Sequence, residues 1–257
     1  MTHPLFNIEN KVVAITGAGG GIGRAVAKGF AESGARLALI ENAEANFEAL
    51  RGELAALNAH AAGYYVLDVT DREGCFSCVK QIVEKFGQVD VLINLAGINQ
   101  RMRPELYTEA IYDRIVDVNL KGTFQMCQAV YSFMKANRYG KIINVGSITA
   151  IAANQHLPVY AATKAAINQL SKSLACAWAP EGIHVNVVHP GWIDTALSRQ
   201  ARVDIPGHAE RVVATTPAGR WGLPEDLVGT MLFLAAPASD FIDGANIVVD
   251  GGVTSQL

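Results

Sequence analysis

Short apolar runs alternate with longer amphipathic stretches along most of the chain. The runs are continuous, which is typical of strands covered on both faces. We expect strands at 12–15, 37–40, 64–67, 91–93, 142–145, 185–188 and 247–249, and helices near 22–33, 44–58, 71–86, 105–136, 159–179 and 224–235. Strand–helix alternation with right-handed crossovers predicts an α/β fold, a doubly wound, seven-stranded parallel sheet with helices on both faces.

The stretch 71–86 illustrates the helical pattern. Asp71 is placed to cap its first turn, and Gly87 is placed to end it. Apolar residues recur along one predicted face, namely Phe76, Val79, Val83 and Phe86. We therefore expect these side chains to be buried.

No linker, charge block or internal repeat divides the chain. We therefore expect one catalytic domain over 1–257, with 192–222 as the only long irregular segment. Since that segment follows the carboxyl end of a predicted strand, where open α/β sheets bind ligands, it is a candidate substrate lid.

Composition narrows the function classes. Of the 257 residues, 50% are hydrophobic and 18% are charged, which is globular usage, and the net charge of −3 offers no basic surface for nucleic acid. No apolar run approaches the ~18 residues of a transmembrane helix, and residues 1–10 lack the order of a signal peptide. With only four cysteines, we expect a soluble, cytoplasmic protein without nucleic-acid or membrane partners.

A glycine cluster follows the first predicted strand and precedes a helix. Gly17, Gly19, Gly20, Gly21 and Gly23 leave room for a pyrophosphate to approach backbone N–H groups at the helix N-terminus, as in a Rossmann-type fold, although a bare loop also uses glycine. Glu41 ends the next predicted strand, near the offset at which a carboxylate meets the adenosine ribose. Because a carboxylate repels a 2′-phosphate, we expect NAD rather than NADP; alternatively, Glu41 is a solvated strand-end residue.

A second group of polar residues has the spacing of a catalytic site. Tyr160 and Lys164 are one helical turn apart and share a face, and Ser147 follows a predicted strand at its carboxyl end. Asn119 is a polar residue within an otherwise apolar helical pattern. A tyrosine–lysine pair that arose by chance on the surface would not be accompanied by Ser147 and Asn119.

These features together resemble the short-chain dehydrogenase/reductase family over essentially the whole chain. Its motifs stand here in order and spacing as Thr16-Gly17-x-x-x-Gly21-x-Gly23, Asp68-Val69, Asn94-Leu95-Ala96-Gly97, Asn119, Ser147, Tyr160-x-x-x-Lys164, Pro190-Gly191 and Asp250-Gly251-Gly252. Leu95 departs from the family, which usually has a second Asn there. We expect this change to alter local packing without removing cofactor binding.

The resemblance implies a hydride-transfer enzyme with four catalytic residues. Tyr160 would be the general acid/base, with its pKa lowered by Lys164 and by the charge of the oxidised cofactor. Ser147 would donate to the substrate oxygen, Lys164 would hold the nicotinamide ribose, and Asn119 would hold a relay water. The residues expected to bind NAD are Gly17, Gly19, Gly20, Gly21, Ile22, Gly23, Glu41, Asp68, Val69, Asn94, Ala96, Gly97, Tyr160, Lys164, Pro190, Gly191, Ile193 and Thr195.

Other reactive residues are expected to be structural. Cys75 and Cys78 form a C-x-x-C within an amphipathic helix without a second ligand pair nearby, so no metal site is expected. His189 precedes the Pro190 turn and is expected to pack or hydrogen-bond. His156 is either a residue of the substrate pocket or an ordinary loop histidine.

The substrate is the least determined feature. Arg101 and Arg103 follow Gly97 in a loop that leaves a strand end, where a guanidinium could bind a carboxylate, although a solvated loop is an equal alternative. Residues 96–101 and 217–222 resemble the gluconate 5-dehydrogenases and 2-deoxy-gluconate 3-dehydrogenases, which favours an aldonate or polyol, with Arg101, Ser147, His156 and Tyr160 as substrate residues. The alternatives are a reductase of 3-oxoacyl thioesters or other ketones, and a non-catalytic dinucleotide sensor. Family analogy implies a homotetramer.

Overall fold

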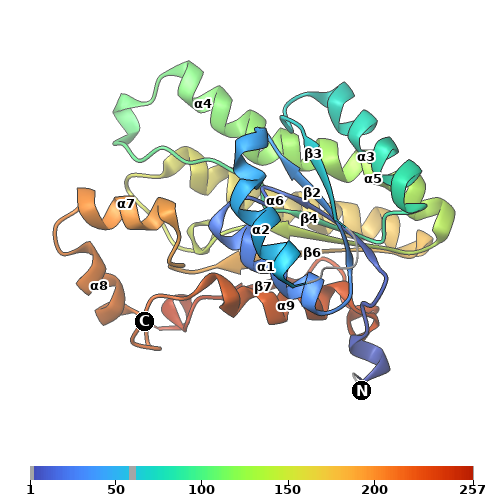
Figure 1. Ribbon diagram of the computed structural model, residues 1–257. Helices are drawn as coiled ribbons and strands as arrows, with labels where there is room; N and C mark the ends of the chain where they lie inside the picture. Colours follow the sequence, from blue (N-terminus) through green and yellow to red (C-terminus); the bar gives the residue numbers. More distant parts are fainter. Residues whose placement is uncertain (1–2, 58–61, 257) are drawn as a thin grey trace.

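A computed structural model describes residues 3–57 and 62–256 (Figure 1). Its seven strands form one parallel sheet in the order β3-β2-β1-β4-β5-β6-β7, as the apolar runs predict. The strands are β1 (Val12–Thr16), β2 (Arg36–Glu41), β3 (Ala62–Val66), β4 (Val91–Asn94), β5 (Gly140–Val145), β6 (Ile183–Pro190) and β7 (Asn246–Val249). The order reverses between β1 and β4, which places a ligand crevice at their carboxyl ends.

Nine α-helices are described. They are α1 (Gly21–Glu32), α2 (Glu48–Ala56), α3 (Arg72–Phe86), α4 (Glu109–Val116), α5 (Thr123–Asn137), α6 (Pro158–Trp178), α7 (Ala196–Asp204), α8 (His208–Thr215) and α9 (Val228–Ala235). Helices α1, α2 and α9 pack on one face of the sheet, and α3, α5 and α6 pack on the other (Figure 1). None of the described helices is long and apolar enough to cross a lipid bilayer.

Each strand serves two hydrophobic cores because successive side chains point to opposite faces. In β1, Val13 and Ile15 belong to the core beneath α1, whereas Val12 and Ala14 belong to the core beneath α3 and α5. All four side chains are fully buried. This double burial explains why the strands appear in the sequence as continuous apolar runs.

Three helix predictions need correction. The stretch 105–136 is not one helix: α4 and α5 are joined by a π-helical segment, Asp117–Gly122. The segment 192–222 is not irregular, since it contains α7 and α8. In α3, Asp71 caps and Gly87 terminates as predicted, but the Phe76 side chain is 40% exposed. Residue 58, the predicted end of the second helix, lies outside the described residues.

Candidate active site

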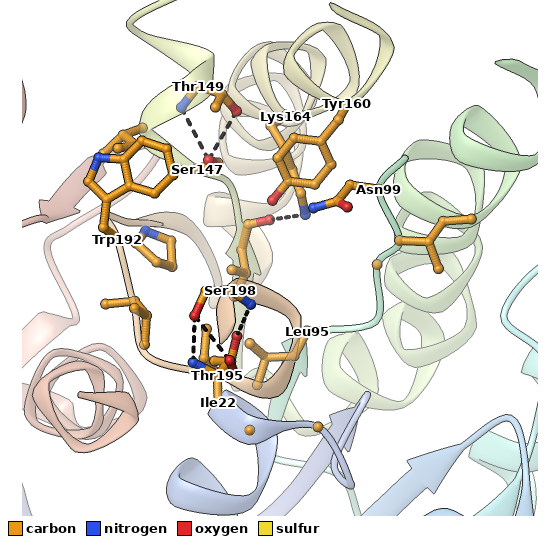
Figure 2. Close-up of a pocket in the computed structure, with 18 of the residues that line it drawn as sticks. Ile22, Leu95, Asn99, Ser147, Thr149, Tyr160, Lys164, Trp192, Thr195 and Ser198 are labelled. Carbon is orange, nitrogen blue, oxygen red and sulfur yellow. Dashed lines mark hydrogen bonds between the residues drawn. The ribbon is translucent and has the colours of Figure 1, made fainter. Parts of the chain in front are cut away.

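A cavity of ≈ 720 Å³ opens at the carboxyl edge of β1, β4, β5 and β6. Ser147, Tyr160 and Lys164 lie together at one end of it, and Ile22 and Thr195 lie at the other (Figure 2). Its volume suits a ligand of the size of a nicotinamide dinucleotide segment with a small substrate. The cavity therefore brings the two predicted groups of residues, the glycine loop and the Tyr160 group, into one site.

The glycine loop has the shape of a phosphate cradle. Gly17 has a φ of +68°, and a Cβ there would lie 2.8 Å from the backbone N of Ala96. A Cβ at Gly23 would lie 2.1 Å from the carbonyl oxygen of Gly17, so neither position accepts a side chain. Gly20 caps α1 without a side-chain hydrogen bond, which leaves N–H groups at the positive end of the helix for an anion.

Glu41 is buried beside this loop and is not the solvated strand-end residue of the alternative interpretation. Its Oε1 accepts a hydrogen bond from Gly19 N at 2.7 Å, and its Oε2 accepts from Asn42 N at 3.3 Å and Asn46 Nδ2 at 3.2 Å. A carboxylate has about four acceptor positions, so at least one is left for a ribose hydroxyl. The negative charge of Glu41 is thus held beside the glycine loop, at the end of β2.

A smaller cavity of ≈ 210 Å³ adjoins Glu41 and is lined by Asp68 and Val69. Burial raises the pKa of Asp68, but hydrogen bonds from Thr70 and Arg114 outweigh it, so the net pKa is lowered. Arg114 also lines this cavity, and its Nη2 lies 3.2 Å from Asp68 Oδ2, so this cation is already paired with an acid. Asp68 provides a polar edge and Val69 provides an apolar wall, and together they fit a flat heteroaromatic ring.

The segment after β4 closes the cavity floor. Thr16 Oγ1 accepts hydrogen bonds from the backbone N–H groups of Leu95 and Ala96, both at 3.2 Å. Asn94 Nδ2 donates to Asn144 Oδ1 at 2.9 Å. Leu95 packs against the core beneath α1 and lines the cavity, and the expected effect of this departure on local packing stays a prediction.

Ser147 is held by two neighbours that fix the direction of its hydroxyl. Thr149 donates to Ser147 Oγ through its backbone N at 3.1 Å and through its Oγ1 at 3.0 Å (Figure 2). Fully buried His189 contacts the Ser147 backbone through Nδ1 at 3.0 Å and Asn246 Oδ1 through Nε2 at 3.0 Å. Because Thr149 fills the acceptor positions of Oγ, the Ser147 proton is left to be donated, and in the structure its partner is Tyr160. The expected hydrogen-bonding role of His189 is confirmed, and the Thr149 contribution was not predicted.

Tyr160 and Lys164 share one face of α6, as their spacing predicts. Lys164 Nζ lies 5.6 Å from the centroid of the Tyr160 ring and donates to the carbonyl oxygen of Val145 at 2.7 Å (Figure 2). Burial lowers the pKa of Lys164 to about 8. Burial also raises the pKa of Tyr160, which hydrogen bonding to Ser147 lowers by less. The predicted lowering of the Tyr160 pKa is therefore not found in the cofactor-free protein.

Asn119 lies in the π-helical segment and is fully buried. Its Oδ1 accepts from Ile98 N at 2.8 Å, and its Nδ2 donates to Ile98 O at 2.9 Å and Thr163 Oγ1 at 3.3 Å. A Cβ at Gly97 would lie 3.4 Å from Asn119 Oδ1 and 3.5 Å from Lys164 Nζ. The amide thus ties the loop after β4 to α6, next to the lysine.

The segment after β6 forms the opposite wall. A Cβ at Gly191 would lie 2.6 Å from Asp250 Cα, so the turn after Pro190 is closely packed. Ile193 pairs with Gly222 in an isolated bridge, which joins the two ends of the α7–α8 segment. Thr195 borders the glycine loop, since a Cβ at Gly21 would meet its Cγ2 at 3.1 Å.

The structure distinguishes between the substrate candidates. Arg101 lines the cavity, and its Nε is buried without a hydrogen-bond partner among the described residues. Arg103 is exposed and pairs with Glu105. The side chain of His156 is not among the described residues that line the cavity, and its backbone oxygen accepts from Met102 N at 3.0 Å. The structure thus brings Arg101, but not His156, to the Tyr160 site.

The structure also places two unpredicted residues, Trp192 and His208, in the cavity wall. Both residues belong to the segment 192–222, and the prediction that this segment is a substrate lid was the only sequence signal that pointed to them. At the cysteine pair, burial raises the pKa of Cys75 and Cys78 to about 12, so both remain protonated thiols within the core. This agrees with the structural interpretation of the C-x-x-C.

Comparisons with known proteins agree with this geometry. The family model described as Enoyl-(Acyl carrier protein) reductase matches residues 17–254. A 2-dehydro-3-deoxy-D-gluconate 5-dehydrogenase of Dickeya dadantii is 36% identical over 250 residues, covering 96% of each chain. A 3-oxoacyl-(acyl-carrier-protein) reductase of Thermotoga maritima is 37% identical over 249 residues, 96% of this chain and 99% of the relative. The structure resembles a gluconate 5-dehydrogenase of Burkholderia cenocepacia in complex with NADP and tartrate, with a TM-score of 0.93, 35% identity and 99% coverage of both chains.

Proposed function

Since the chain belongs to the short-chain dehydrogenase/reductase family and is an oxidoreductase acting on CH–OH groups, we propose that it oxidises a secondary alcohol of a sugar acid with NAD. One observation carries the choice of substrate: the cavity that holds Tyr160 also holds Arg101, a half-buried residue whose buried Nε has no hydrogen-bond partner and which has no carboxylate partner among the described residues. A guanidinium binds a carboxylate through paired N–H groups. The sugar-acid dehydrogenases among its relatives support the same class.

The proposed catalytic residues divide the chemistry between binding and proton transfer. A bound nicotinamide would supply the acceptor for the hydride that leaves the carbinol carbon. Ser147 donates its proton to the substrate oxygen, because Thr149 fills its acceptor positions. Tyr160 takes the proton that leaves this oxygen as the hydride departs. Lys164 holds the ribose hydroxyls, and Asn119 links the lysine to the loop after β4.

The cradle fits a dinucleotide, and Glu41 favours NAD. The glycine positions leave no room for side chains, and the two cavities follow each other along the carboxyl edge of the sheet. A 2′-phosphate would meet the buried Glu41 carboxylate at close range, which costs several kcal/mol without a neighbouring cation. Among the lining residues of the smaller cavity, the cation Arg114 is already paired with Asp68.

The test is NADH formation with a panel of substrates. We expect the highest kcat/KM with an aldonate such as D-gluconate, lower values with D-glucitol, and a rise of at least about tenfold in the KM for the aldonate in Arg101→Ala, since a charged hydrogen bond contributes about 1.5–3 kcal/mol. Tyr160→Phe should lose turnover and keep NADH binding. The exposed Arg103→Ala serves as the matched control.

A 3-oxoacyl thioester reductase is the second candidate, because such a reductase is among the relatives. It would prefer reduction of a 3-oxoacyl thioester to oxidation of any aldonate, and Arg101→Ala would leave that activity unchanged. This outcome would overturn the sugar-acid proposal while leaving the family assignment intact.

The proposal extends to a single catalytic domain that acts as a homotetramer in the cytoplasm, with the α7–α8 segment as a substrate lid. All four cysteines are free thiols, which is usual for a reducing compartment. The lid is supported by its attachment, since the Ile193–Gly222 bridge joins its two ends while α7 and α8 project beside the cavity (Figure 1).

A further inference from the structure

The lid contributes a histidine to the cavity that nothing above uses. His208 is the first residue of α8, is 2% exposed and lines the cavity together with Arg101. Its ring lies edge-on to Trp192 and Trp221, with centroids 5.2 Å and 5.8 Å away and interplanar angles of 83°. The two indoles fix the orientation of the imidazole.

The protonation state of His208 follows from its neighbour Arg211. Arg211 Nη2 lies 3.1 Å from His208 Nδ1, and because a guanidinium can only donate, Nδ1 accepts. Burial lowers the pKa of His208, and the positive charges of Arg101, Arg211 and Arg202 lower it further. The neutral imidazole therefore carries its proton on Nε2. Nε2 has no acceptor among the described residues.

The surroundings of His208 are cationic. Of its three arginine neighbours, Arg202 is paired with Asp194 at 3.0 Å. Arg101 and Arg211 make no ion pair with any acid whose side chain the structure describes, and repulsion from Arg211 adds to burial in lowering the pKa of Arg101. A buried donor without an acceptor is unfavourable, so this end of the cavity favours an anion with acceptor oxygens.

We propose that His208 binds the carboxylate of the substrate together with Arg101, by donating the proton on Nε2, so that α8 carries part of the specificity for sugar acids. This inference rests on the proposed function, since it requires an anionic substrate. His208 Nε2 and Arg101 Nε are both shielded from solvent, so the contact requires a small outward displacement of α8. The Ile193–Gly222 bridge joins the α7–α8 segment at its base, and α8 (His208–Thr215) lies between the two bridged residues in the chain.

The test compares two substrates of equal length with and without a carboxylate. In His208→Phe, which keeps an aromatic ring between the tryptophans, the KM for D-gluconate should rise about tenfold or more, whereas kcat and the KM for D-glucitol should change less than about twofold. His208→Gln restores a donor near the position of Nε2 and should recover most of the affinity. Calorimetric titration of D-gluconate into the NADH-loaded protein should give the same ranking without turnover. Glu210→Gln, an exposed change on the same helix, is the control.

The outcomes separate this inference from the proposed function. If D-gluconate is oxidised in an Arg101-dependent way but His208→Phe changes both substrates equally, His208 only packs against the tryptophans and the inference fails alone. Failure of His208→Gln to recover affinity would contradict donation from Nε2. If the wild-type protein prefers D-glucitol, the sugar-acid proposal fails, and the inference fails with it.

Discussion

Lys164 carries a buried positive charge whose hydrogen-bond acceptor among the described residues is the carbonyl oxygen of Val145. Burial lowers its pKa to about 8, so the cofactor-free protein pays for keeping this group protonated near neutral pH. The ribose hydroxyls of a bound cofactor would add acceptors there. Stability is thus given up at a residue to which we assign a part in the reaction.

We predict that Lys164→Met stabilises the cofactor-free protein by about 1–2 kcal/mol at pH 7, since removal of the charge outweighs loss of the Val145 hydrogen bond. The unfolded chain binds more protons than the folded one between pH 8 and 10.5, so wild-type stability gains on the variant as pH rises through that window. Urea unfolding at pH 7 and pH 9.5 measures both. A variant less stable at pH 7, or a gap independent of pH, would contradict the assigned charge.

Glu41 is predicted to determine cofactor choice. In Glu41→Ala the ratio of kcat/KM for NAD to that for NADP should fall at least about tenfold, because the ribose loses an acceptor and a 2′-phosphate loses a repelling charge. Glu44→Ala, which removes an exposed carboxylate paired with Arg51 nearby, should leave the ratio unchanged. An unchanged ratio in Glu41→Ala would contradict the NAD assignment.

At this scale the sequence predicts residues whose chemistry is local to one element. Tyr160 and Lys164 meet because four residues make about one helical turn. Gly17 belongs to a glycine cluster between a predicted strand and a helix, and the structure shows its left-handed φ of +68°. His208 could not be predicted, because its role depends on Arg101 and Trp192, which are brought near it only by the tertiary fold. His156 was left open between a pocket residue and a loop histidine, and the structure favours the second, since it is not among the described residues that line the cavity.

At the scale of elements, the break between α4 and α5 positions Asn119. A π-helical segment contains one residue more than the α-helix around it would, and such segments are frequent at functional sites. Here the extra residue turns the Asn119 amide toward both backbone groups of Ile98. The sequence showed a polar residue in an apolar pattern without showing this change of helical register.

Deletion of Lys121 is predicted to convert the π-helical segment into α-helix. The far-UV circular dichroism should be retained, but kcat should fall by about 100-fold or more, because Asn119 rotates and leaves the Ile98 backbone groups without partners. Lys121→Ala, which changes an exposed side chain without changing register, is the control. Wild-type turnover in the deletion variant would show that the segment has no part in the site.

Helix faces were less predictable than helices. In α3 the buried side is formed by Cys75, Cys78, Val79, Ile82 and Phe86, while the guanidinium of Arg72 lies over the exposed Phe76 ring at 5.0 Å. The predicted apolar face included Phe76, because it is a large aromatic residue, and it did not include Cys75 and Cys78, which are buried on the observed face. Helix α7 was missed because its sequence is strongly polar, and periodic apolar residues are the main signal of a helix.

For the whole molecule, topology was predictable and assembly was not. Seven doubly covered strands with helical crossovers leave few alternatives to a parallel sheet, and the observed order follows that expectation. A tetramer has no comparable signal in the sequence, because the apolar residues of α5 and α6 serve the core. The exposed apolar side chains at the β7 edge of the sheet are the basis for a prediction about assembly.

The β7 edge is predicted to be an interface between copies of the chain. Strand β7 ends the sheet, Val248 is 37% exposed, and the Phe241 side chain is fully exposed at 102%. Leu5 and Phe6, 51% and 50% exposed, both lie in the 3-10 turn Pro4–Phe6, which packs against Pro237–Ser239, two residues before Phe241 in the chain. An open edge strand flanked by large apolar side chains is normally covered in a soluble protein.

Light scattering after gel filtration should therefore give a tetramer for the wild-type protein and a smaller species for Phe241→Asp at micromolar concentration, since each interface would bury a charge without a partner. Phe76→Asp places the same change on an exposed ring of α3, which packs against α5, and should leave the mass unchanged. NADH binding per chain should survive in Phe241→Asp, because Phe241 is not among the described residues that line the cavity. A wild-type monomer, or equal effects of both substitutions, would remove β7 as the interface.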